Sequence, residues 1–192
     1  KYEFSYNDKN QLVSKILYFD EKNIAEKVFY SFNENNVIIK EEHLYTESDS
    51  TEFVHYFYDN EGKLTSKKSV DEDDECEWEV FFEYDNDKLI SETRKEYEKT
   101  FYERKIKYDE AGNISEIYEV QSDDFPVKHV FEYDEKGNEI KKLKYNHKNK
   151  LIGKILCEYN EQNKLIAFEE EDTSKHHSNI IEYDEKGNLI LH

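Results

Sequence analysis

The chain has 192 residues, a formal net charge of −19 and a mean hydropathy of −1.06. This acidity repels phosphate backbones and anionic membrane surfaces, and no apolar run approaches the roughly 20 residues of a membrane span, so neither nucleic-acid binding nor membrane insertion of this segment is expected. Disorder, which the polarity alone would suggest, is disfavoured by 16 Tyr and 12 Phe, because disordered chains are poor in aromatic residues.

The predicted elements follow one pattern that recurs along the whole chain. Each copy begins with an aromatic anchor, Tyr in seven copies and Phe in one, and Asp or Asn follows the anchor in all eight. The steps between successive anchors are 26, 26, 26, 24, 25, 26 and 24 residues, which indicates a repeat architecture. The anchors are Tyr6, Phe32, Tyr58, Tyr84, Tyr108, Tyr133, Tyr159 and Tyr183.

The residues after each anchor predict a turn. Asp or Asn side chains bond to backbone N–H groups just ahead of them and so start a bend. Four residues past the anchor, Gly or Asn stands in seven copies, and these residue types accept a left-handed backbone most readily. This spacing is typical of a type I turn closed by a bulge residue. Lys88 is the exception, and a tighter turn centred on Asn86–Asp87 is expected there.

The residues before each anchor predict a strand. The second residue before the anchor is apolar or aromatic in all eight copies, whereas the residue directly before it is polar in seven. This period of two is the strand signal, and a second strand opens after each turn with Leu, Ile or Val. The sequence therefore predicts an all-β fold: about eight β-hairpins, or 16 strands, in one antiparallel meander over residues 1–192, forming a long, twisted or curled sheet without helices. Only five residues follow Gly187, too few to complete the last hairpin.

A second apolar stripe lies three residues before the anchors. Its members are Phe29, Phe81, Val130, Leu156 and Ile180. Because this stripe falls on the other face of the sheet, it needs cover from curling, a second copy or a partner.

The repeat resembles a known family. The stretches "FEYDEKGNEI" from Phe131 and "IEYDEKGNLI" from Ile181 are similar to the YD repeat of the Rhs/YD-repeat proteins. The resemblance implies a mostly bacterial, secreted or cell-surface protein whose repeats wind an antiparallel sheet, either as a shell around a toxic domain or as an adhesion surface. The chain departs from that family in its Gly-Asn and Gly-Lys turns and in lacking an Asp-Pro-x-Gly-Leu self-cleavage core and a variable toxin tail.

No catalytic, cofactor or metal residues are predicted. The seven His share no repeat position, and the adjacent His176 and His177 should point to opposite faces of a strand. "DEDDE" at 71–75 could attract Ca²⁺, but it lacks the Gly and spacing of a known loop, so a solvated return loop is expected. Cys76 and Cys157 form no CxxC motif, and each is expected to be a small buried apolar residue.

The aromatic residues are the feature with functional potential. Tyr56, Trp78 and Phe82 are the candidate ligand-binding residues, since such rings could form a stacking platform for glycans. The alternative, which we favour, is that the rings are the core of a thin sheet, with each anchor beside the apolar residue that opens the next strand.

The sequence favours a non-enzymatic, secreted or cell-surface protein that acts as a binding or scaffold module, through a protein partner or self-association. Two alternatives stay open: a carbohydrate-binding module, and a fragment of an Rhs-type toxin-encapsulating shell. A chain that starts at Lys1 and contains no Met is expected to be a processed or cloned piece from which the targeting segment is absent.

Overall fold

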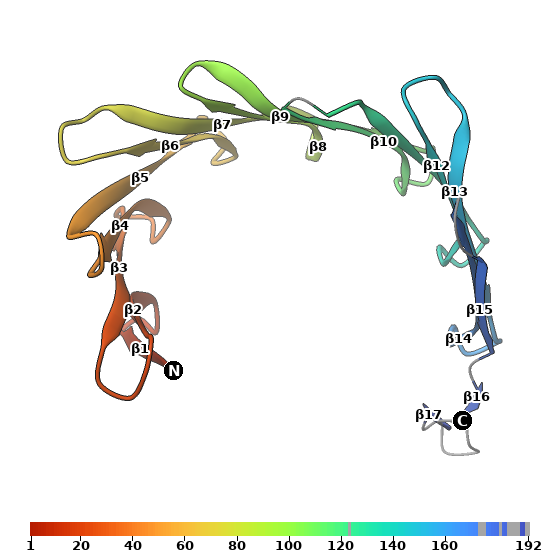
Figure 1. Ribbon diagram of the computed structural model, residues 1–192, viewed down its shortest axis with the longest axis horizontal. Coiled ribbons are helices and arrows are strands. Elements are labelled where there is room, and N and C mark those ends of the chain that lie inside the picture. The colour runs from red at the N-terminus through yellow and green to blue at the C-terminus, as the bar shows by residue number, and fades with distance from the viewer. Residues whose placement is uncertain (123, 173–175, 181, 184–188, 191–192) are drawn as a thin grey trace. The chain divides into compact units, whose positions relative to one another are not determined.

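The computed structural model describes residues 1–122, 124–172, 176–180, 182–183 and 189–190, and these residues contain strands but no helix (Figure 1). The strands are β1 (Tyr2–Tyr6), β2 (Leu12–Tyr18), β3 (Ile24–Phe32), β4 (Ile38–Tyr45), β5 (Ser50–Tyr58), β6 (Leu64–Val70), β7 (Cys76–Asp85), β8 (Lys88–Glu96), β9 (Lys99–Tyr108), β10 (Ile114–Gln121), β11 (Val127–Tyr133), β12 (Glu139–Tyr145), β13 (Leu151–Tyr159), β14 (Leu165–Asp172), β15 (His176–Ile180), β16 (Glu182–Tyr183) and β17 (Leu189–Ile190).

The predicted antiparallel meander is confirmed. Strands β1 to β15 lie in sequence order in one 15-stranded sheet, while β16 and β17 form a separate two-stranded pair. That pair corrects one expectation, because Leu189 and Ile190 do pair with Tyr183 and Glu182 despite the few residues after Gly187. The turn at Gly187 itself lies outside the described residues.

The chain forms two compact units, which are described separately. Unit 1 contains Lys1–Asp87 and Glu92–Phe101, and unit 2 contains Lys88–Ser91 and Tyr102–His192. The boundary passes through β8 and β9. The assignment of residues 1–192 to a single domain stays a prediction.

The hairpin turns have the predicted chemistry. In the turn after Tyr58, the Asp59 carboxylate accepts the N–H groups of Glu61 and Lys63, both at 2.9 Å, and Gly62 adopts a φ of 84°. The left-handed position is occupied in the same way in five other turns, by Asn10, Asn36, Gly112, Gly137 and Asn163. The shortened turn is confirmed as well, since β7 ends at Asp85, β8 begins at Lys88 and Asn86 has a φ of 53°.

Two of the return connections use the same Asx chemistry. Within "DEDDE", Asp71 accepts the N–H groups of Asp73 and Glu75 at 2.9 Å, and Asp74 takes the left-handed position with a φ of 63°. In the connection between β12 and β13, the side chain of Asn146 accepts the N–H groups of Lys148 and Lys150 in the same way, and Asn149 has a left-handed backbone. The acidic segment is therefore an ordered Asx turn rather than an irregular loop, and its residues 72–75 are exposed, as expected of a solvated return loop.

The anchor tyrosines join neighbouring hairpins. Tyr58 pairs with Leu64, the first residue of the next strand, as predicted. Its hydroxyl also donates to the backbone carbonyl of Ile38, in the preceding hairpin, at 2.8 Å. The same bond recurs from Tyr108 to Leu89 and from Tyr133 to Ile114, at 2.9 Å each. The anchor thus packs in its own hairpin and hydrogen-bonds to the previous one.

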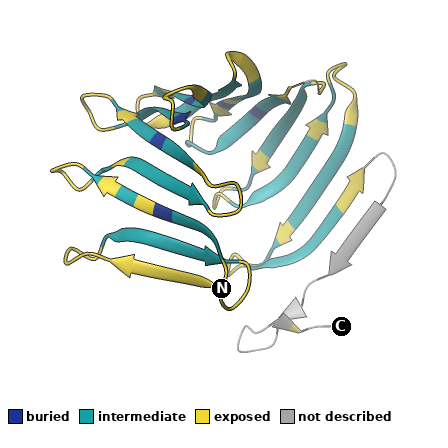
Figure 2. Cartoon of the chain, turned by 60° about the vertical axis from the view of Figure 1, so that its left-hand side comes forward, coloured by how far each residue is buried: buried dark blue, intermediate teal, exposed yellow. Residues whose placement is uncertain are grey.

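The core is thin. The buried apolar side chains among the described residues are Val28, Val54, Val70, Val80, Ile106 and Ile117. Three of them, Val28, Val54 and Val80, stand four residues before an anchor, so the repeat buries this position in unit 1. Elsewhere intermediate exposure prevails along the strands (Figure 2). The expectation of two buried cysteines was wrong for Cys76, which is exposed at the start of β7, whereas Cys157 is partly buried.

Candidate functional site

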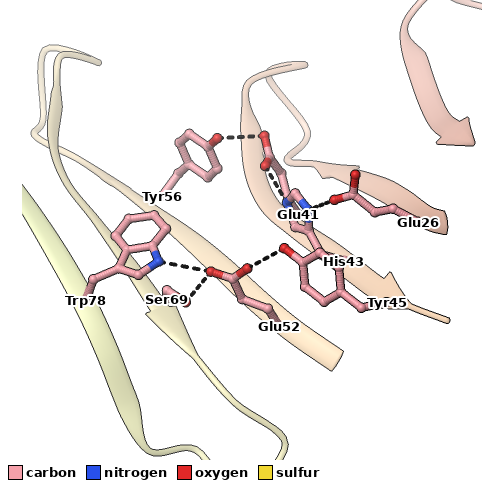
Figure 3. A network of polar contacts seen from close by, with 8 residues as sticks. All are labelled: Glu26, Glu41, His43, Tyr45, Glu52, Tyr56, Ser69 and Trp78. Carbon is pink, nitrogen blue, oxygen red and sulfur yellow. Dashed lines mark hydrogen bonds and ion pairs between the residues drawn. The ribbon is translucent and has the colours of Figure 1, made fainter. Parts of the chain in front are cut away.

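Unit 1 carries a polar network on the face of the sheet that contains the buried Val28, Val54 and Val80 (Figure 3). Strand register creates it, because Val28 pairs with His43, His43 with Glu52, and Val54 with both Glu41 and Ser69. Side chains of paired residues share a face, so polar groups from five consecutive strands meet there. Its eight members are Glu26, Glu41, His43, Tyr45, Glu52, Tyr56, Ser69 and Trp78.

His43 links two carboxylates. Its Nδ1 lies 2.8 Å from Glu26 Oε1 and its Nε2 lies 2.9 Å from Glu41 Oε2. The contact with Glu41 is the main cause that raises the pKa of His43, with Glu26 adding to it against the opposing effect of burial. In turn, the pKa of Glu41 is lowered, first by His43 and then by the Tyr56 hydroxyl, which donates at 2.7 Å. The imidazolium form therefore holds this half of the network together.

Glu52 is the centre of the other half, where three neutral groups donate to one carboxylate. The donors are Ser69 Oγ at 2.6 Å, Tyr45 Oη at 2.9 Å and Trp78 Nε1 at 3.0 Å. Burial alone would raise the pKa of Glu52, but these hydrogen bonds outweigh it and the pKa is lowered. The Glu52 carboxylate stays ionised in its partly buried position because three hydrogen-bond donors contact its oxygens.

The chemistry available to the network is limited by its own hydrogen bonds. Both ring nitrogens of His43 face carboxylates, so neither is directed at a substrate. Burial and their glutamate partners raise the pKa values of Tyr45 and Tyr56, so both hydroxyls remain protonated donors. The arrangement fixes side chains across neighbouring strands, and a structural role accounts for each of its contacts.

The three candidate ligand-binding residues lie on this same face, and polar or cationic groups already contact all of them. The hydroxyl of Tyr56 and the indole N–H of Trp78 donate to glutamates of the network. The Lys67 ammonium lies 5.4 Å from the ring centroid of Tyr56 and 5.9 Å from that of Phe82. The Arg94 guanidinium lies 5.0 Å from the Trp78 ring. A glycan would compete with these cations for the ring faces, and ligand binding by the three residues stays a prediction.

Sequence reasoning missed Glu26, Glu41, His43, Tyr45, Glu52 and Ser69. One signal was available, since Glu26 and Glu52 both stand six residues before an anchor, on the same face as the valines four before it. A carboxylate repeated on the apolar face of a strand needs partners. Those partners lie on β4, β6 and β7, and they become visible only when the strands are aligned.

Among the residues that the structure describes, no group of three or more His, Cys, Asp or Glu side chains is placed to hold a metal ion. The same residues include no helix long and apolar enough to cross a membrane.

Comparisons with known proteins show the fold but no family. No family model matches the chain, and neither does any curated protein. Among solved structures, the crystal structure of TcdB2-TccC3-Cdc42 is similar with a TM-score of 0.55 and 11% identity, over 96% of this chain and 12% of that one. The crystal structure of TcdB2-TccC3-TEV matches over 94% of this chain and 14% of that one at 8% identity, but its TM-score is only 0.30. The first likeness supports an Rhs-like fold, and the chain spans about an eighth of the length of that neighbour.

Proposed function

We propose that this chain is a non-enzymatic scaffold of the secreted or cell-surface kind, which uses its sheet to bind a second copy or another protein. The observation that carries the proposal is the single layer. Strands β1 to β15 form one sheet, and no helix among the described residues covers either face. A single-layered sheet leaves much of the surface of its aromatic residues exposed to water. A partner that packs against the sheet would bury that surface.

Exposed aromatic side chains lie on both faces of unit 1. Tyr2 and Phe4, on β1, share the face of the polar network because Phe4 pairs with Lys15 and Lys15 with Val28. On the opposite face, Phe29 is 43% exposed and Phe57 is 47% exposed. Phe29 belongs to the second apolar stripe predicted from the sequence, and Phe57 lies on the same face. A docking surface on this face is defined here by Phe29 and Phe57.

Sedimentation velocity over a range of protein concentrations tests the proposal. The wild-type chain is expected to associate as its concentration rises, and the double variant Phe29→Lys, Phe57→Lys is expected to stay monomeric. A matched control, Ser31→Lys with Thr51→Lys, adds the same charge to the same face at polar positions and should associate like the wild type. A wild-type chain that stays monomeric throughout and does not bind an apolar dye would contradict the proposal.

A second candidate is a wall segment of a toxin-enclosing shell. It is favoured by the structural likeness, which covers nearly all of this chain but a small part of a much longer one. A wall segment would continue edge to edge with further strands, so this candidate requires pairing along β1, whose Tyr2, Phe4 and Tyr6 are exposed. Replacing Phe4 with Lys should then prevent assembly, whereas the Phe29 and Phe57 variant should not.

The carbohydrate-binding alternative rests on Tyr56, Trp78 and Phe82 sharing one face. A glycan array with the wild-type chain tests it, with Trp78→Ala as the variant that should lose binding. An array without any bound glycan would eliminate this alternative.

A further inference from the structure

Unit 2 contains a hollow of about 460 Å³ on the surface of strands β11 to β14. Its volume falls within the range of small-ligand sites, roughly 300–1,000 Å³. Two rows of paired residues run across it. His129 pairs with Lys144, Lys144 with Gly153, and Gly153 with Asp172. Beside this row, Lys142 pairs with Ile155, and Ile155 pairs with Glu170.

Gly153 creates the hollow because it contributes no side chain between Lys144 and Asp172. The other glycines of the described residues, Gly62, Gly112 and Gly137, are left-handed turn residues, whereas Gly153 lies inside β13 and does not have a left-handed backbone. Packing does not require a glycine either, since a Cβ at this position would meet Lys144 Cβ at 3.4 Å and the Glu171 carbonyl oxygen at 3.7 Å. A glycine inside a strand weakens the strand, and it often marks a bulge or a place where a ligand approaches the backbone closely. The ladder between β12 and β13 shifts register beside Gly153, between Lys144 and Tyr145, but the corresponding shifts beside Glu26 and Trp78 occur without a glycine.

One wall of the hollow is cationic. Lys142 and Lys144 project from β12, and within the described part of the chain neither forms an ion pair with a carboxylate. The buried Nδ1 of the adjacent His129 has no hydrogen-bond partner there, while its Nε2 lies 3.5 Å from Glu119. Burial and then the charge of Lys142 lower the pKa of His129, and Lys144 acts in the same direction. Two neighbouring lysines without a carboxylate partner are unexpected in a chain with 46 acidic and 27 basic residues, and the ammonium of Lys142 lies instead 5.5 Å from the ring of Phe131.

The opposite wall is acidic. Glu170 and Asp172 lie on β14, two strands away from Lys142 and Lys144, at a backbone separation of roughly 9.6 Å for two strand spacings. A simple anion would be attracted by one wall and repelled by the other. A ligand with a carboxylate at one end and an ammonium group at the other would match the charge of both walls across Gly153.

We propose that the hollow over Gly153 binds a small zwitterion of the ω-amino carboxylate class. Its carboxylate lies against Lys144 and the ring of His129, with Lys142 beside them, and its ammonium group lies against Glu170. The apolar carbon chain between the two groups lies over Gly153 and beside Ile155. A chain of about four to six carbons is compatible with two walls whose strands lie ~9.6 Å apart. This site is independent of the scaffold proposal, since it uses unit 2 and neither Phe29 nor Phe57.

Calorimetric titration of the full chain with 4-aminobutyrate, 5-aminopentanoate and 6-aminohexanoate tests the site. At least one of these probes is expected to bind, and butyrate and butylamine, which each carry one of the two charges, should bind at least tenfold more weakly. Such a loss is typical when a charge-assisted hydrogen bond is removed. The absence of heat from every probe, or equal binding of butyrate alone, would overturn the proposal.

Variants locate the binding. Lys144→Gln should weaken the tightest probe by about tenfold, the loss expected for one charge-assisted hydrogen bond. Gly153→Leu should abolish binding by filling the hollow, and circular dichroism checks that this variant folds. The matched control is Lys141→Gln, on the same strand but the opposite face, where Lys141 pairs with Glu132 at 2.7 Å. Binding that is unchanged by Lys144→Gln, or weakened equally by Lys141→Gln, would place the ligand elsewhere and refute the proposal.

Discussion

Individual side chains show how an acidic, polar sequence keeps charge inside a thin sheet. Glu52 is partly buried on the apolar face of β5, yet its pKa is lowered because Ser69, Tyr45 and Trp78 donate to it. Ser69 is the most deeply buried of these donors, with 0% of its surface exposed. Removing a donor from a partly buried carboxylate leaves the charge without compensation.

We therefore expect Ser69→Ala to lower the free energy of unfolding by about 1.5–3 kcal/mol, the usual contribution of a hydrogen bond to a charged group. Urea denaturation monitored by Trp78 fluorescence measures the change. Ser66→Ala is the matched control, on the same strand but the opposite face, and it should change stability by less than about 0.5 kcal/mol. Equal effects of the two substitutions would show that the bond to Glu52 contributes little.

His43 makes the stability of unit 1 dependent on pH. Its pKa in the folded chain is raised above 6.5 by Glu41 and Glu26, so its contribution is fully present below about 6.5 and is lost as the pH rises through the raised value. The pKa of Glu41 is lowered, so its contribution is present above about 4.5 and is lost as the pH falls through the lowered value. Urea unfolding measured across pH should show both losses. His43→Gln should remove the loss at high pH, and a variant that keeps the wild-type slope there would contradict this assignment.

At the scale of the element, the turn is the unit that the repeat preserves best. Gly137 has a φ of 83° and its missing side chain faces open space, so only the backbone conformation favours glycine there. Asn occupies the same left-handed position at Asn10, Asn36 and Asn163. The cost of a side chain at this position should therefore depend on the type of residue.

Gly137→Ala is expected to destabilise the chain by about 1–2 kcal/mol, and Gly137→Asn by clearly less, because Asn accepts the left-handed region. Thermal unfolding of the two variants beside the wild type gives the comparison. If both substitutions cost the same, steric crowding rather than backbone conformation would have to be responsible.

The hairpins were predictable because each turn and strand is encoded within about ten consecutive residues. Asp59 and Gly62, for example, mark a turn without reference to any other part of the chain. Some return connections escaped prediction for the opposite reason. The turn between β8 and β9 places Tyr97 and Glu98 at φ values of 46° and 64°, and neither residue type signals a left-handed backbone.

The polar network was not predictable, since it depends on how successive hairpins align. Glu52 meets Trp78, 26 residues away, only after the lengths and bulges of the intervening turns have set the register of β5, β6 and β7. One residue of slip in any of these pairings would move every side chain of a strand to the other face. The aromatic candidates were identified from the sequence, but their cationic and carboxylate neighbours come from other strands.

At the scale of the whole molecule, lysine side chains cover part of the aromatic surface that a second layer would otherwise bury. The ammonium group of Lys40 lies 4.0 Å from the ring centroid of Phe53, and that of Lys95 lies 5.2 Å from Phe81. In unit 2, Lys142 lies 5.5 Å from the ring of Phe131. Such contacts contribute about 0.5–1 kcal/mol each at exposed sites, and the alkyl stems cover apolar surface while the charges stay in water.

Phe29 and Phe57 remain exposed despite this cover, and the scaffold proposal depends on their exposure. Hydroxyl-radical footprinting of the full chain, read by mass spectrometry at low and high protein concentration, tests it at the side chains themselves. We predict that oxidation of Phe29 and Phe57 falls as the chain associates, while oxidation of Phe19, in the turn after β2 and 64% exposed, stays constant. Oxidation of Phe29 and Phe57 that stays as constant as that of Phe19 at every concentration would contradict self-association through this face.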